Sequence, residues 1–178
     1  MKNFLAGSFF YIKAGCCLLF VFWSALYASA QSSVSIGAGI NQPVQSGFGI
    51  GWEAGLQYNI KLADKLYIDP ALSYAELNPA NNFQTRNWKL YKFGLGGKYY
   101  LSNPFFVRAG AFVQLEKDSY LNTGGQIGAL IGAGYDIPLS GRNLLEVSAR
   151  SDFWRPTHHE FRPILGLAVA YKFRFADK

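Results

Sequence analysis

The only two histidines of the chain stand together in Thr157-His158-His159-Glu160, and Ser151 and Asp152 shortly precede them. A general base beside a hydroxyl is what acyl transfer needs, so this segment is a candidate site for a lipid-modifying enzyme. The histidines and Glu160 also offer metal ligands, but neighbours in sequence rarely point at one ion and no further strong ligand is apparent beyond Glu160. A solvated loop tip is the simpler interpretation. We therefore assign no catalytic, cofactor-binding or metal-binding residue.

A glycine-rich segment, Gly94-Leu-Gly-Gly-Lys98, has a superficial likeness to a phosphate-binding loop. It lacks the upstream glycine and the hydroxyl after the lysine, and no helical pattern follows, so it predicts no nucleotide cofactor.

Cys16 and Cys17 follow Ala-Gly, as acylated cysteines do. Lys13, however, stands where a lipidation signal needs an apolar residue, and the long apolar run follows the pair instead of preceding it.

The start of the chain has the organisation of a secretory signal peptide. Lys2 and Lys13 supply basic charge, residues 14–26 form an apolar run, and Ala28-Ser29-Ala30 is the small-residue pattern that signal peptidase reads. We therefore predict a signal peptide at 1–30 and one mature domain at 31–178. A retained anchor is the alternative, but the run is short for a spanning helix and no basic stop-transfer segment follows it.

Removal of the leader changes what the composition implies. The formal net charge falls from +6 to +4 because Lys2 and Lys13 leave, so the pI of 9.3 gives little support to a nucleic-acid partner. Both cysteines leave as well, and the mature chain would have no disulfide. No later stretch approaches the roughly 18 apolar residues of a spanning helix, which argues against a helical membrane protein.

Beyond Gln31, apolar and polar side chains alternate with a period of two, which is the pattern of β-strands. Each alternating segment is about as long as a tilted strand must be to cross a bilayer. The alternation predicts eight strands, at residues 33–41, 48–60, 66–77, 87–101, 105–116, 125–137, 143–154 and 161–175. We expect an all-β fold, an antiparallel up-and-down transmembrane barrel, because a closed barrel in lipid satisfies both an apolar outer face and a charged inner face.

Segments rich in Asn, Gly and Pro separate the strands. An even number of strands puts both ends of the barrel chain on one side, which for an exported barrel is the periplasm. The periplasmic turns are then 61–65, 102–104 and 138–142, and the outer loops are 42–47, 78–86, 117–124 and 155–160. The cations of the outer loops are candidates for contact with lipopolysaccharide phosphates; they are Arg86, Lys89, Lys117 and Arg155.

The predicted outer face is apolar, and no charge interrupts its middle, where a cation would cost roughly 2–4 kcal/mol. Aromatic side chains gather near both ends of this face, as expected of the two girdles of a membrane barrel. One girdle would contain Phe48, Tyr74, Tyr91, Phe153 and Phe161, and the other Tyr58, Tyr99, Phe105, Tyr135 and Phe175.

The predicted inner face carries six acids and seven bases. The acids are Glu53, Asp69, Glu116, Asp136, Glu146 and Asp152, and the bases are Lys92, Lys98, Arg108, Arg150, Arg162, Lys172 and Arg174. This balance suits a lumen cross-linked by ion pairs, since an unpaired buried charge is strongly destabilising. Twelve of the nineteen glycines share this face. They leave room for its aromatic side chains, which are Trp88, Tyr100, Phe106, Phe112 and Trp154.

A soluble lipocalin-like barrel is the rival geometry, but its apolar lumen would put all of these charges outside.

Pro70 and Pro163 fall within strands, and each removes one hydrogen-bond donor from a sheet without a free edge. For Pro70 we expect a bulge or a local lapse in pairing.

One stretch of the chain resembles a hairpin of small outer-membrane β-barrels. It consists of Leu90-Tyr-Lys-Phe-Gly-Leu-Gly-Gly-Lys-Tyr-Tyr-Leu101, a short proline turn and Phe105-Phe-Val-Arg-Ala-Gly110. This is the OmpA/OmpX-like group, including PorT-type barrels. The ending Ala170-Tyr-Lys-Phe-Arg-Phe175 resembles the signal by which the barrel-assembly machinery selects its clients. Residues 176–178 depart from that pattern, because many such barrels stop at the aromatic residue.

The resemblance and the residues together predict a non-enzymatic integral outer-membrane protein with both termini in the periplasm. Its expected role is structural, or that of an accessory subunit of an envelope assembly. The expected partners are membrane lipid, lipopolysaccharide, the assembly machinery and other envelope proteins. A lipid A-modifying enzyme and a small channel are the alternatives, although a lumen packed with paired charges should not conduct freely.

Overall fold

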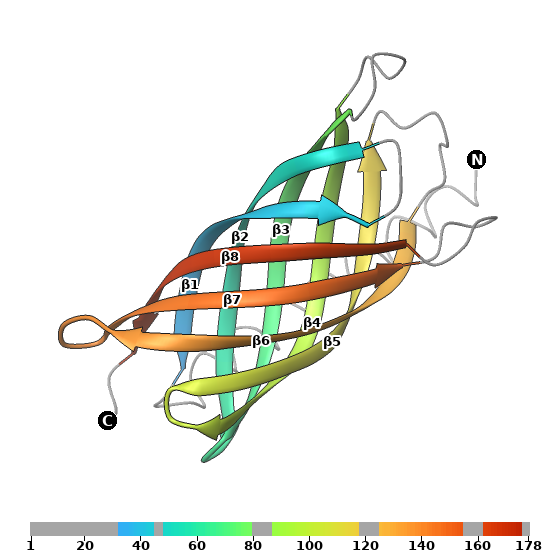
Figure 1. Ribbon diagram of the computed structural model, residues 1–178. Helices are drawn as coiled ribbons and strands as arrows, with labels where there is room; N and C mark the ends of the chain where they lie inside the picture. The colour runs from blue at the N-terminus through green and yellow to red at the C-terminus, as the bar shows by residue number, and fades with distance from the viewer. Residues whose placement is uncertain (1–31, 45–47, 80–86, 118–124, 155–161, 176–178) are drawn as a thin grey trace, which may run out of the picture.

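The protein forms one closed antiparallel barrel in a computed structural model that describes residues 32–44, 48–79, 87–117, 125–154 and 162–175 (Figure 1). The strands are β1 (Ser33–Pro43), β2 (Phe48–Ala63), β3 (Leu66–Pro79), β4 (Trp88–Ser102), β5 (Phe105–Lys117), β6 (Gly125–Pro138), β7 (Asn143–Trp154) and β8 (Arg162–Arg174). No helix within the described ranges has the length and apolar character to span a bilayer. The predicted leader lies outside these ranges, and its cleavage stays a prediction.

The barrel closes where the first strand meets the last. β1 pairs with β8 over its whole length, from Ser33 opposite Arg174 to Pro43 opposite Ile164. Every strand is therefore hydrogen-bonded on both sides, and the sheet presents no row of unpaired backbone groups to its surroundings. This closure confirms the predicted up-and-down barrel of eight strands.

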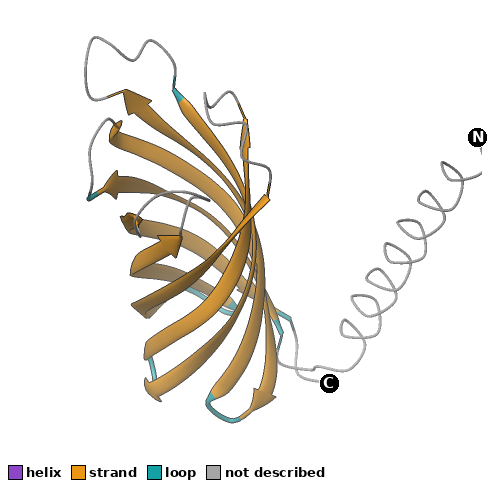
Figure 2. Cartoon of the chain, turned by 90° about the vertical axis from the view of Figure 1, so that its right-hand side faces the viewer, coloured by secondary structure: helices purple, strands orange, loops and turns teal. Residues whose placement is uncertain are grey.

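The strands differ from their predicted bounds by at most three residues, mainly because the hairpin ladders continue further than the apolar pattern does. β2 and β3 stay paired as far as Ala63 and Leu66, which leaves only residues 64 and 65 for the turn. Tight turns after β2, β4 and β6 lie at one end of the barrel, the turn end (Figure 2). We call the opposite end, where β1 leads toward β2, the loop end.

The two faces of the wall separate as the alternation predicts. On β8, Leu167 is 58% exposed on the outer surface, whereas Lys172 on the inner surface is 2% exposed. The same contrast recurs along the other strands, with large apolar side chains outside and charged ones buried inside. A soluble barrel with an apolar lumen would show the opposite arrangement, so the soluble alternative was wrong.

Pro70 produces the expected lapse in pairing. Between β2 and β3 the ladder joins Gln57 to Ala71 and resumes at Ile60 and Ile68 in the same register, with no pair between these points. On its other side, Pro70 stays paired with Leu95 of β4. The missing N–H therefore interrupts one ladder locally and leaves the closure of the barrel intact.

The prediction that Phe48 faces outward was wrong. The β2–β3 ladder shifts register between Phe48 and Gly51, which marks a β-bulge or a similar irregularity. Such an irregularity re-aims the side chain beyond it. The Phe48 ring lies 4.8 Å from the ring of Trp88, centroid to centroid, and packs against the buried apolar side chains of the lumen.

Inward-facing glycines lie opposite the rings of β5. Phe106 pairs with Gly134 of β6, and Phe112 pairs with Gly128. A Cβ on Gly134 would lie 2.4 Å from Phe106 Cζ and 2.8 Å from the Val147 carbonyl oxygen. On Gly128 it would lie 2.3 Å from Phe112 Cζ. The rings thus occupy space that a side chain on β6 would need.

We expect Gly128→Ala and Gly134→Ala each to lower the free energy of unfolding by about 1–3 kcal/mol, because the added methyl group overpacks the lumen. Urea titration of the barrel folded in lipid vesicles measures the change. Gly97→Ala is the matched control, since its only neighbour within 4 Å would be the Tyr67 carbonyl oxygen at 4.0 Å. Equal losses for all three variants would contradict the packing explanation.

Candidate functional site

The structure does not bring the candidate catalytic residues together. Ser151 and Asp152 are consecutive on β7 and point to opposite faces of the wall, as neighbours on a strand do. Asp152 is buried in the lumen, where its carboxylate lies 2.7 Å from Lys92 Nζ. Thr157, His158, His159 and Glu160 lie outside the described residues. Within the described part of the chain, no three His, Cys, Asp or Glu side chains are grouped to hold a metal ion.

The most distinctive site is the lumen itself, and Glu53 is the centre of its first charge cluster. Glu53 Oε2 accepts hydrogen bonds from Lys92 Nζ at 3.1 Å and Asn41 Nδ2 at 2.7 Å. Arg150 also donates to this carboxylate. Lys92 and Arg150 each reach Asp152 as well, at 2.7 and 3.3 Å. Two acids and two bases from three strands, β2, β4 and β7, thus form one neutral cluster.

A second cluster lies nearer the turn end. Lys98 Nζ is 2.8 Å from Glu146 Oε2, and Lys172 Nζ is 2.7 Å from the same oxygen. Lys172 also binds both oxygens of Asp136, at 2.7 and 2.8 Å. The Tyr100 hydroxyl donates to Asp136 at 2.6 Å. This cluster again has two acids and two bases, and both of its lysines are almost fully buried.

Arg108 and Asp69 form the remaining pair of the lumen, with Arg108 NH2 3.1 Å from Asp69 Oδ2. Gln57 connects the two, because its carbonyl oxygen accepts from Arg108 NH1 at 3.2 Å and its amide donates to Asp69 at 3.3 Å. The amide of Gln57 also donates to Asn59 Oδ1 at 2.8 Å, which extends the network along β2.

The described lumen is electrically neutral. Its ion pairs involve five acids and five bases, and both numbers are slightly lower than the predicted six and seven. The structure does not describe the side chains of Glu116 and Arg162, and Arg174 is exposed at the turn end instead of lying among the pairs. Neutrality matters here because a buried charge without a partner is strongly destabilising.

Aromatic rings of β5 line the charge clusters. Lys98 Nζ lies 4.2 Å from the centroid of the Phe106 ring, and Lys172 Nζ lies 5.7 Å from it. Lys92 Nζ lies 5.9 Å from the Phe112 centroid. The ring faces provide favourable surroundings for desolvated ammonium groups, so these contacts add to the ion pairs. The prediction that aromatic side chains share the lumen with the charges is confirmed for both rings.

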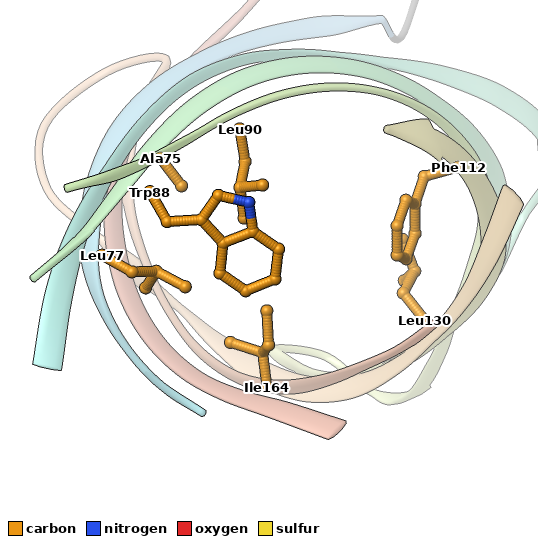
Figure 3. Packing of buried hydrophobic residues seen from close by; sticks show 7 residues of the cluster. All are labelled: Ala75, Leu77, Trp88, Leu90, Phe112, Leu130 and Ile164. Atoms are coloured by element: carbon orange, nitrogen blue, oxygen red, sulfur yellow. The ribbon is translucent and has the colours of Figure 1, made fainter. Parts of the chain in front are cut away.

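An apolar cluster occupies the lumen toward the loop end (Figure 3). Its buried members are Ala75, Leu77, Trp88, Leu90, Phe112, Leu130 and Ile164. They point inward from β3, β4, β5, β6 and β8, and Phe48 packs against them. Trp88 and Phe112 were predicted to point inward, whereas the aliphatic members were not. The aliphatic members stand at inward positions of the alternating pattern, beside those rings. This alternation is the signal that would have revealed them.

A small cavity remains in the lumen, lined mainly by β1, β2, β3, β7 and β8. Its volume is about 90 Å³, and its lining includes Glu53, Arg108, Glu146 and Arg150. Glycine, alanine and serine supply most of the other lining residues. At roughly 10–15 Å³ of accessible volume per water, the cavity has room for several water molecules.

Comparison with known proteins gives a fold and no family. No protein-family model matches the chain, and no curated protein matches it. Neisserial surface protein A superposes with a TM-score of 0.60 at 16% identity, over 81% of this chain and 97% of that one. The outer membrane protein OprG from Pseudomonas aeruginosa gives a TM-score of 0.61 at 12% identity, over 83% and 97%.

The outer membrane enzyme PagL also has a similar structure, with a TM-score of 0.54 at 18% identity over 79% of this chain and 98% of that one. At this identity the likeness extends to the fold alone. The chain therefore has the fold of the small eight-stranded outer-membrane β-barrels, as the resemblance in its sequence predicted.

Charge neutrality in the lumen can be tested at Lys98. We expect Lys98→Met to lower the free energy of unfolding by about 3–5 kcal/mol, because it leaves the buried lumen with one excess acid. The double variant Lys98→Met/Glu146→Gln restores neutrality and keeps the pair of Asp136 and Lys172, so it should lose less. Urea titration in lipid vesicles compares the two. A larger loss in the double variant would contradict neutrality as the controlling factor.

Proposed function

We propose that this protein is an integral outer-membrane barrel that works by contact, as a structural component or as an accessory subunit of an envelope assembly. The observation that carries the proposal is the contrast between the two faces of the wall. The outer surface exposes large apolar side chains on all eight strands, while the lumen is occupied by neutral ion-pair clusters and an apolar cluster. A barrel of this kind offers its outer surface and its loops, and not its interior, to other molecules.

Several features support this location and orientation. Residues 33 and 174 lie side by side at the turn end, so one side of the membrane receives both ends of the described barrel. Short turns on the periplasmic side and longer loops outside are the rule for such barrels. The proposal therefore places both termini in the periplasm, with membrane lipid and lipopolysaccharide around the wall. The assembly machinery would recognise the final strand, and other envelope proteins are possible subunits.

The proposal is tested by extracting outer membranes in a mild detergent and measuring the native mass of the mature protein. Stoichiometric partners, identified by mass spectrometry, would favour the accessory role, and a lone monomer would favour the structural one. Recovery in the soluble fraction would contradict the proposal, because the apolar outer surface requires lipid or detergent.

We expect no stable single-channel conductance when the folded barrel is inserted into planar bilayers. The charged side chains of the described lumen are paired, and an apolar cluster projects into the lumen toward the loop end. A channel-forming porin inserted under the same conditions is the positive control. Reproducible conductance steps from the purified protein would favour the channel alternative.

A lipid A-modifying activity is the second alternative, and it predicts a change in lipid A mass when the protein is produced. We expect no such change, because Asp152 is buried in ion pairs on the opposite face from Ser151. Mass spectrometry of lipid A from cells with and without the protein measures it. A mass change that His158→Ala abolishes without affecting folding would establish an enzyme instead.

A further inference from the structure

One part of the outer surface differs from the apolar belt. At the loop end of β2, β3 and β4, the ladders place Trp52 opposite Glu76, and Glu76 opposite Lys89. One row nearer the turn end, Tyr74 stands opposite Tyr91. The rim patch, as we call this region, consists of Trp52, Tyr74, Glu76, Asn87, Lys89 and Tyr91. Lys89 lies in β4, as the predicted strand 87–101 has it, and not among the loop cations with which it was grouped.

The three rings of the rim patch form a continuous surface across three strands. The Tyr74 ring lies 5.3 Å from that of Trp52 and 5.0 Å from that of Tyr91, centroid to centroid, with tilts of 59° and 55°. Trp52 is 46% exposed and Tyr91 is 42% exposed. These exposed ring surfaces are therefore available to a molecule beside the barrel. They lie near the loop end, at the level where a membrane barrel meets the lipid headgroups.

Glu76 is the feature that an aromatic girdle alone does not explain. Among the strand acids whose side chains the structure describes, it is the one on the outer surface. Its carboxylate is held in place, because Asn87 Nδ2 donates to Oε1 at 2.6 Å and the Tyr74 hydroxyl donates to Oε2 at 3.1 Å. A fixed carboxylate beside exposed rings still has lone pairs for further donors, and lipid tails provide none.

We propose that the rim patch binds the phosphorylated sugar headgroup of lipopolysaccharide in the outer leaflet. This inference rests on the proposed function, because it requires the loop end to face outward. A sugar ring packs its C–H face on aromatic rings, and its hydroxyls donate to a carboxylate such as Glu76. Lys89, next to Glu76 in the ladder, supplies the charge that attracts a phosphate on the same headgroup.

Other occupants fit the rim patch less well. A lipid with an anionic headgroup but no sugar would meet the carboxylate of Glu76 without hydroxyls to offer it. A stable protein interface typically takes about 20–30 residues on each side, whereas the rim patch has six. The combination of rings, carboxylate and cation therefore favours a charged saccharide.

The test uses the mature barrel folded in phosphatidylcholine nanodiscs and titrated with purified lipopolysaccharide. We expect saturable binding that Trp52→Leu weakens by at least about tenfold, as the loss of one well-placed aromatic contact would. Glu76→Gln should weaken it as well, because the neutral amide is a poorer acceptor for hydroxyls. Tyr135→Leu is the matched control, since Tyr135 is a ring of similar exposure, 47%, near the turn end.

The outcomes separate this inference from the function on which it rests. Failure of the wild-type protein to insert into bilayers would overturn both. Insertion with equal effects of Trp52→Leu and Tyr135→Leu would overturn only the inference, since any girdle residue would then serve. Phosphatidylglycerol is the second probe. If it binds the barrel as tightly as lipopolysaccharide does, the rim patch is an anion site without sugar recognition, and this result also overturns the inference.

Discussion

Backbone hydrogen bonding is the constraint on which the rest of this structure depends. A chain that crosses lipid as strands must pair every N–H and C=O group within the wall, and only closure of the sheet achieves this. The ladder between β1 and β8, which runs the full length of β1, supplies that closure. The lapse at Pro70 is tolerated because the ladder resumes in the same register beyond it.

Closure then decides what the lumen contains. Because the outer face carries apolar side chains, the charged side chains of the strand interiors must share the narrow lumen. They persist there only in balanced groups. β4 illustrates the result, because its inward side chains contribute Trp88 and Leu90 to the apolar cluster and Lys92 and Lys98 to the two charge clusters. Glycines opposite the β5 rings provide the remaining space.

A filled lumen moves the functional question to the outside of the barrel. The described lumen is occupied largely by paired charges and apolar side chains, and the candidate residues Ser151 and Asp152 are divided between the two faces of the wall. The rim patch on β2, β3 and β4 is the part of the described outer surface where rings and a fixed carboxylate occur together. Contact with the headgroup layer is consistent with a protein whose work is done at its surface.

The sequence by itself determined the number of strands, the face to which most side chains point and the interruption at Pro70, because alternation and the missing proline donor are local properties. Only the tertiary structure decided which charges pair, since Lys92 and Asp152 are 60 residues apart and meet across the lumen. It also decided the reversal of Phe48, which follows from a register shift between two strands. Pairing across a barrel depends on the stagger and tilt of all its strands together, and no single segment of sequence carries that information.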